Sequence, residues 1–208
     1  MSNYKTVFFI LGVLQIILGL SMIVPIIAQF YYNQVDSGFI GSGLVSIIFG
    51  VLFFLSNLDY EKKLTLPQAF LLTALSWLSI AIFGSLPFVF SDLSLSFTNA
   101  FFESMSGITT TGSTILTNLN EAPKAILLWR AMLQWLGGIG IIVMAITLMP
   151  IMNIGGMQLF VISNTHTPEK ILPKSKEISI RLIAIYSSLT LVCAFFYKIF
   201  GMSFFDSI

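Results

Sequence analysis

Charged residues are scarce in this sequence. Only 9% of its 208 residues are Asp, Glu, Lys or Arg, against roughly 25% in an average soluble domain. The formal net charge is +1, so no strong field of either sign is available to attract nucleic acid or another polyion. A soluble globule could not cover its surface with so few charges. These shortages exclude a soluble enzyme, a nucleic-acid-binding protein and a disordered chain.

Cysteine and histidine are almost absent. A single cysteine, Cys193, excludes an internal disulfide and any Cys-x-x-Cys metal or redox site. A single histidine, His166, excludes a zinc site built from several histidines. What remains is an integral membrane protein with few polar residues, and the function must come from those polar residues.

Long apolar runs are abundant instead. Hydrophobic residues make up 56% of the chain, and the mean hydropathy is +0.94. A helix needs about 20 mostly apolar residues to cross a ~30 Å hydrocarbon layer. We therefore predict five transmembrane helices, at about residues 6–30, 39–58, 66–90, 126–152 and 178–200. The first is interpreted as a retained helix, because its apolar run exceeds the roughly 7–15 residues of a cleaved signal.

The distribution of basic residues predicts the orientation. Lys and Arg accumulate in cytoplasmic loops, which places the N-terminus in the cytoplasm and residues 91–124 outside. Three basic residues are then directed outward: Lys124, Arg130 and Lys198. The others are cytoplasmic: Lys5, Lys62, Lys63, Lys170, Lys174, Lys176 and Arg181.

The segment between the third and fourth spans is unusual. Residues 97–107 are apolar enough to enter the membrane, but about 11 residues are too few to cross it. Ser94 or Ser96 is suited to cap the start of this helix, and Gly107 is suited to end it. Residues 108–114 follow, with β-branched side chains, a glycine and hydroxyls that disfavour a helix. We predict a short re-entrant helix and an extended return.

Such a segment is suited to bind a cation. Non-helical backbone is tolerated at membrane depth only where protein or a water-filled path satisfies it. The carbonyl end of a half-helix carries roughly half a negative charge, and extended carbonyls can replace the hydration shell of an ion. The candidate ion-binding residues are Thr110, Thr111, Gly112 and Ser113, with Thr109 in support. A plain extracellular loop with a threonine-rich turn is the alternative.

Two charged residues are predicted to lie behind this segment. Glu103 belongs to the short helix and Arg130 to the start of the fourth span, where an unpaired charge is expensive. We predict that they form an ion pair that supports the filter; the alternative is that each reaches interfacial water. Asp and His are missing from the five spans, which argues against an intramembrane enzyme.

Three sequence stretches resemble one known family. Residues 101–114 (FFESMSGITTTGST) resemble the first pore loop of the Trk/Ktr/HKT superfamily of potassium transport proteins. Residues 128–141 (LWRAMLQWLGGIGI) and 155–160 (GGMQLF) are similar to its bacterial TrkH branch. The likeness covers almost all of the chain, which is identified as the N-terminal portion of a TrkH-type member.

The resemblance implies an all-α integral membrane fold of potassium-channel-like helix–pore loop–helix repeats, four of which surround one pore. It divides the chain into two extra transmembrane helices (1–63), a first repeat (64–152), a cytoplasmic connection (153–177) and an incomplete second repeat (178–208). Residues 203–208 echo residues 96–101, as a repeat requires. The implied function is potassium uptake across the bacterial cytoplasmic membrane, with residues 109–114 as one quarter of the selectivity filter and K⁺ at Thr110 and Thr111.

The resemblance also implies partners. These are membrane lipid, a second copy in a homodimer, and a cytosolic nucleotide-binding regulatory subunit of the TrkA type; the transported K⁺ is the ligand, and no covalent cofactor or nucleic acid is expected. A sodium-permeable transporter is one alternative, which Gly112 disfavours because some plant members carry Ser there. A non-conducting or assembly subunit is the other. The 208 residues alone are expected to insert without conducting.

Overall fold

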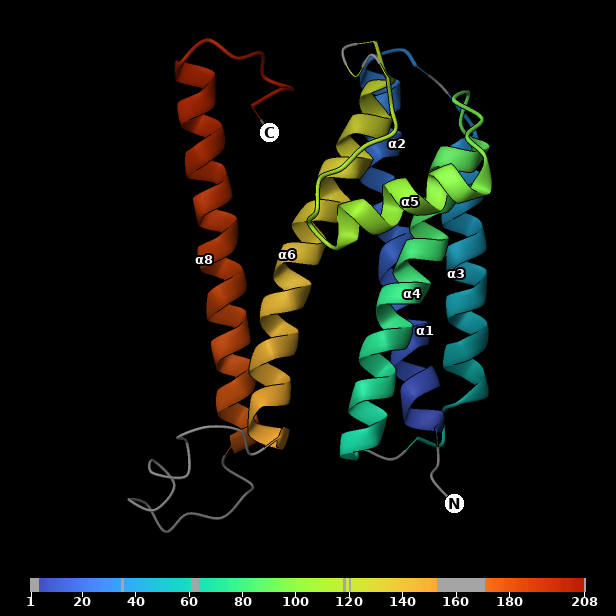
Figure 1. Cartoon of the computed structure of the whole chain (residues 1–208), viewed down its shortest axis with the longest axis vertical. Coiled ribbons are helices and arrows are strands. Elements are labelled where there is room, and N and C mark those ends of the chain that lie inside the picture. The colour runs from blue at the N-terminus through green and yellow to red at the C-terminus, as the bar shows by residue number, and fades with distance from the viewer. Residues whose placement is uncertain are drawn as a thin grey trace. The chain divides into compact units, whose positions relative to one another are not determined.

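The computed structural model describes residues 4–34, 36–60, 64–117, 119, 121–152 and 171–207. The described residues form helices joined by connecting segments (Figure 1). The chain divides into two compact units, Met1–Gly138 and Ile139–Ile208. The helices are α1 (Lys5–Ser21), α2 (Ile23–Tyr31), α3 (Gly38–Ser56), α4 (Leu66–Phe90), α5 (Phe97–Ile108), α6 (Lys124–Met152) and α8 (Ile171–Ile199).

The predicted membrane spans are present in the described part of the chain. Five helical segments there are long and apolar enough to cross a membrane: Lys5–Tyr31, Gly38–Ser56, Leu66–Phe90, Lys124–Met144 and Glu177–Ile199. The chain is therefore a multi-pass membrane protein.

The first span is not the single helix that its hydropathy predicts. It is interrupted at Met22, between α1 and α2. Pro25 lies one turn later and has no N–H to donate to the carbonyl of Ser21, so the helical ladder breaks there. At the end of α1, the Ser21 hydroxyl donates a hydrogen bond to the carbonyl of Leu18 at 2.7 Å.

The last helix is longer than its membrane span. It begins at Ile171, ahead of the start at residue 178 that hydropathy predicts. A helix can continue beyond the part that crosses the membrane. Proline is tolerated in the first turn of a helix, where residue 173 of α8 lies. The predicted connection at 153–177 is correspondingly shorter, and its residues 153–170 lie outside the described part of the chain.

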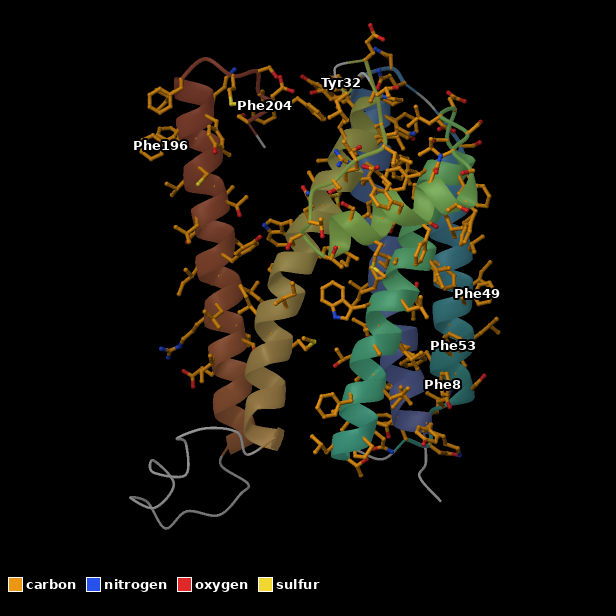
Figure 2. The ribbon with its side chains drawn as sticks, in the orientation of Figure 1. Phe8, Tyr32, Phe49, Phe53, Phe196 and Phe204 are labelled. Carbon is orange, nitrogen blue, oxygen red and sulfur yellow. The ribbon has the colours of Figure 1, made fainter. Side chains whose placement is uncertain are left out.

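Helices α1, α3 and α4 pack together in the first unit. A Cβ atom on Gly12 would lie 2.7 Å from the carbonyl oxygen of Gly50, so the backbones of α1 and α3 approach closely, as small residues allow between membrane helices. Figure 2 shows Phe8 and Phe53 beside each other on these helices, with ring centroids 5.8 Å apart. The buried core continues through Met22, Phe39, Phe88, Trp129 and Leu133.

The connection between α2 and α3 holds the segments on either side of α5. The Gln34 side-chain oxygen accepts a hydrogen bond from the backbone N–H of Lys124 at 3.0 Å, where α6 begins. The Asp36 carboxylate accepts one from the N–H of Asp92 at 3.2 Å, just after α4. The connection between α2 and α3 is therefore hydrogen-bonded to both chain segments that flank α5, one before it and one after it.

Helix α5 has the predicted length. Its 12 residues rise ~18 Å, too little to cross a ~30 Å hydrocarbon layer. Of the two predicted capping residues, Ser96 caps the helix: its side-chain oxygen accepts from the N–H of Asn99. The helix ends at Ile108, one residue after the predicted Gly107.

The same capping interaction occurs near the end of the chain. The Ser203 hydroxyl oxygen accepts from the N–H of Asp206 at 3.1 Å, three residues later, as Ser96 accepts from Asn99. The two stretches that resemble each other in sequence, residues 96–101 and 203–208, therefore share this one hydrogen bond, although residues 204–207 form turns and not a helix.

Candidate ion-binding site

The chain reverses direction at the end of α5. The N–H of Thr110 bonds to the carbonyl of Gly107 at 2.9 Å, and the N–H of Thr111 bonds to that of Ser106 at 3.0 Å. This is the Schellman pattern, which satisfies the last carbonyls of a helix with a residue in the left-handed conformation. Thr110 occupies that position with φ +58°, although a β-branched residue is a rare choice there. Figure 1 shows the chain then returning toward the start of α6.

The hydrogen bonds of this turn determine where two carbonyls point. The N–H groups of Thr111 and Gly112 both point at the Ser106 carbonyl, at 3.0 and 3.4 Å. In a trans peptide the preceding carbonyl points the opposite way, and the described residues contain no cis peptide. The carbonyls of Thr110 and Thr111 are therefore directed away from α5. Both residues are exposed, so two successive oxygens are available to a cation.

Ser113 is arranged differently. Its carbonyl accepts a hydrogen bond from the Ser106 hydroxyl at 2.6 Å. This carbonyl is therefore directed toward α5, opposite to those of Thr110 and Thr111. The four predicted ion-binding residues are adjacent in the chain. The Ser113 carbonyl, however, does not lie on the face to which the carbonyls of Thr110 and Thr111 point.

Gly112 lies between these two arrangements. Its φ is +78°, in the left-handed region that side chains rarely adopt. A Cβ atom built on it would lie 3.4 Å from the side-chain nitrogen of Gln134, on α6. A side chain at residue 112 would therefore meet both backbone strain and a polar neighbour.

Thr109 connects the helix to the return segment through its hydroxyl. The hydroxyl donates to the carbonyl of Met105 at 2.7 Å and lies 2.9 Å from the hydroxyl of Thr111. A hydroxyl has one proton, so Thr111 must be the donor in the second contact. This arrangement suits the supporting position expected of Thr109.

Glu103 and Arg130 are brought together, as the sequence predicts. The Glu103 Oε1 atom forms an ion pair with Nε of Arg130. The Glu103 side chain is 0% exposed and that of Arg130 is 16% exposed. The second oxygen, Oε2, accepts from the backbone N–H of Ile115 at 3.0 Å. One buried carboxylate therefore joins α5, α6 and the return segment.

The end of α5 is pressed against α6. A Cβ atom on Gly137 would overlap the carbonyl of Ile108, so only glycine permits this approach. The glycine-rich stretch of the fourth span thus has a packing role at this residue. Gly140 is different, because a Cβ there would have no neighbour within 4 Å.

Sequence reasoning missed two residues at the site, Ser106 and Gln134. Ser106 lies three residues before the first threonine of the run, and Gln134 is one of the few polar residues in an apolar span. Their contacts depend on the chain reversal and on the approach of α6, which a linear pattern does not encode.

The candidate ligand atoms at this site, the carbonyls of Thr110 and Thr111, are neutral oxygens. Among the described residues, no three His, Cys, Asp or Glu side chains come together as a metal site would require. Backbone carbonyls suit a hard cation that exchanges its hydration shell for protein oxygens and leaves again. The negative end of the α5 dipole lies at the same place.

Comparison with known proteins identifies relatives along the whole chain. The family model TrkH, described as a cation transport protein, matches residues 5–204. The chain is 38% identical to the Trk system potassium uptake protein TrkI of Halomonas elongata over 200 residues, covering 96% of this chain and 41% of that protein. It is 37% identical to TrkH of Escherichia coli K12 over 210 residues, covering 99% of this chain and 44% of that protein.

A solved structure is similar as well. The crystal structure of the potassium transporter TrkH from Vibrio parahaemolyticus superimposes with a TM-score of 0.87 and 34% identity. The match covers 100% of this chain and 42% of that one. The chain therefore spans less than half the length of the relatives that it matches.

Proposed function

Because this chain belongs to the TrkH family of cation transport proteins, in which the relatives are transporters and not enzymes, we propose that it contributes to a potassium uptake protein. Residues 109–114 form one quarter of its selectivity filter, with K⁺ at the carbonyls of Thr110 and Thr111. One observation carries the proposal: these two carbonyls are directed away from α5. They belong to exposed residues at the negative end of that helix.

A dehydrated K⁺ needs oxygens on several sides, and one loop reaches the ion from one side only. The relatives are more than twice as long as the matched segment, which leaves room for further loops. The helix–pore loop–helix unit is residues 64–152, and a second unit begins at 178. The capping interaction of Ser203, like that of Ser96 before α5, supports a second pore helix starting there.

The proposed setting is the cytoplasmic membrane of a bacterium, with the N-terminus in the cytoplasm. The excess of Lys and Arg in the connections on that side supports this orientation. The proposed partners are a second copy of the protein and a cytosolic nucleotide-binding subunit of the TrkA type. The family resemblance supports both partners. We propose that the regulatory subunit meets the cytoplasmic connection at 153–177, which lies mostly outside the described residues.

The Gly112→Ser variant tests the preference for K⁺ over Na⁺. A side chain at residue 112 meets the strain of φ +78° and the amide nitrogen of Gln134. Such strain costs about 1–3 kcal/mol, and the chain can relieve it by moving the neighbouring carbonyl of Thr111. A difference of ~1.4 kcal/mol between the binding of the two ions would correspond to a tenfold change in their ratio. We expect the ratio of K⁺ to Na⁺ uptake to fall about tenfold when the complete gene is expressed in cells that lack other potassium uptake systems.

A matched control is Gly41→Ser, since a Cβ there has no neighbour within 4 Å and Gly41 lies in α3, apart from the site. It should leave the uptake ratio unchanged. An unaltered ratio in Gly112→Ser, with normal amounts of protein in the membrane, would refute the filter assignment.

A further inference from the structure

We propose that Ser106 is a positioning residue that limits the row of carbonyls facing the ion. The inference rests on the proposed function, because it assigns Ser106 to the filter that residues 109–114 form. Ser106 lies in the last turn of α5, is only 6% exposed, and its hydroxyl is directed at the carbonyl of Ser113.

One residue binds three successive members of the filter segment. The Ser106 carbonyl accepts from the N–H groups of Thr111 and Gly112, at 3.0 and 3.4 Å. The Ser106 hydroxyl donates to the carbonyl of Ser113 at 2.6 Å. The two hydrogen bonds to the Ser106 carbonyl can form with any residue at position 106. The hydrogen bond to the Ser113 carbonyl requires a side chain that can donate. The hydroxyl is therefore the part of Ser106 that the choice of amino acid controls.

The Ser106 hydroxyl determines where the row of carbonyls facing the ion ends. The carbonyls of Thr110 and Thr111 are directed away from α5, and that of Ser113 is directed toward it. Because peptide groups are planar and trans, the N–H of Thr114 then points away from α5. A donor at that level repels a cation, so the peptide between Ser113 and Thr114 marks the end of the ion-facing row.

Removing the hydroxyl would release this peptide. The Ser113 carbonyl would lose its donor, and a carbonyl without a partner costs free energy unless it turns toward water or an ion. A rotated peptide would add a carbonyl to the ion-facing row and withdraw the Thr114 N–H from it. The number of coordinating carbonyls is one of the terms that set ion selectivity, so the preference between K⁺ and Na⁺ should change.

Ser104 provides a matched comparison in the same helix. It is fully buried and carries a hydroxyl, as Ser106 does, but its hydroxyl has no hydrogen-bond partner among the described residues. Replacing either serine with alanine removes one buried oxygen from α5. Only the Ser106 replacement removes a contact with the filter segment.

The test compares Ser106→Ala with Ser104→Ala in the complete protein. K⁺ and Na⁺ uptake are measured in the same cells, together with the amount of protein in the membrane. One hydrogen bond to an otherwise unpaired group corresponds to roughly a fivefold to tenfold effect. We expect the uptake ratio of K⁺ to Na⁺ to change by this factor in Ser106→Ala and to stay constant in Ser104→Ala. Ser106→Cys, which keeps the size and a weak donor, should lie between Ser106→Ala and the unmodified protein.

The outcomes separate this inference from the proposed function. A normal uptake ratio in Ser106→Ala, with an altered ratio in Gly112→Ser, would overturn the role of Ser106 and leave the filter intact. Uptake without any preference for K⁺ in the unmodified protein would overturn both. If Ser106→Ala does not reach the membrane, Ser106→Cys decides the question. Loss of both variants from the membrane would make Ser106 a folding residue and also overturn the inference.

Discussion

Replacing Arg130 with methionine is expected to destabilise the protein by about 3–5 kcal/mol, because the fully buried carboxylate of Glu103 loses its counter-charge. Glu103→Gln should cost less, since the Arg130 side chain is 16% exposed and can still reach polar surroundings. The glutamine can also keep the bond to the N–H of Ile115. In the double variant no charge is stranded, so its loss should be smaller than the sum of the two single losses.

Thermal unfolding of the purified complete protein, measured for the two single variants and the double variant, tests this coupling. The control is the pair of Glu177 and Arg181, whose side chains are 62% and 74% exposed. Glu177→Gln should have an effect of no more than about 0.5 kcal/mol, as is usual for an exposed pair one helical turn apart. Strictly additive losses at Glu103 and Arg130 would show that the two charges act independently.

Replacing Gly137 with alanine is expected to destabilise the contact between α5 and α6 by about 1–3 kcal/mol or more. The added Cβ would overlap the carbonyl of Ile108, which is backbone and cannot move aside as a flexible side chain could. Ile108 is the last residue of α5, so its displacement would also move the return segment. We therefore expect both a lower unfolding temperature and slower potassium uptake.

Gly140→Ala is the matched control, three residues further along α6, where a Cβ has no neighbour within 4 Å. Because alanine favours a helix over glycine by ~1 kcal/mol, this variant should be neutral or slightly stabilised. Equal unfolding temperatures for Gly137→Ala and Gly140→Ala would contradict the close approach of the two helices.

Hydropathy and length were sufficient to predict much of this fold. The membrane spans follow from apolar runs, and the short helix α5 follows from a run too short to cross. The cap at Ser96 follows from side-chain chemistry that acts over three residues. The pairing of Glu103 with Arg130 was predictable because a charge inside the membrane needs a partner, and few were available.

Other features depend on geometry that a linear pattern does not carry. The break at Met22 reflects one missing N–H at Pro25 within an otherwise uniform apolar run. The hydroxyl of Ser106 reaches the carbonyl of Ser113 only because the chain reverses between them. The opposite directions of the Thr111 and Ser113 carbonyls follow from that reversal. The residue pattern indicated residues 109–114 as a filter segment, which stays a prediction, but it could not indicate which carbonyls of that segment are directed away from α5.

K⁺ is proposed to bind at the backbone oxygens of Thr110 and Thr111. Anomalous diffraction from crystals of the complete protein grown with Rb⁺ in place of K⁺ tests it most directly, because Rb⁺ can be located independently of the protein model. We expect an anomalous peak in direct contact with these two carbonyl oxygens and none at the carbonyl of Ser113. Rb⁺ peaks elsewhere in the protein, with none touching residues 109–114, would contradict it.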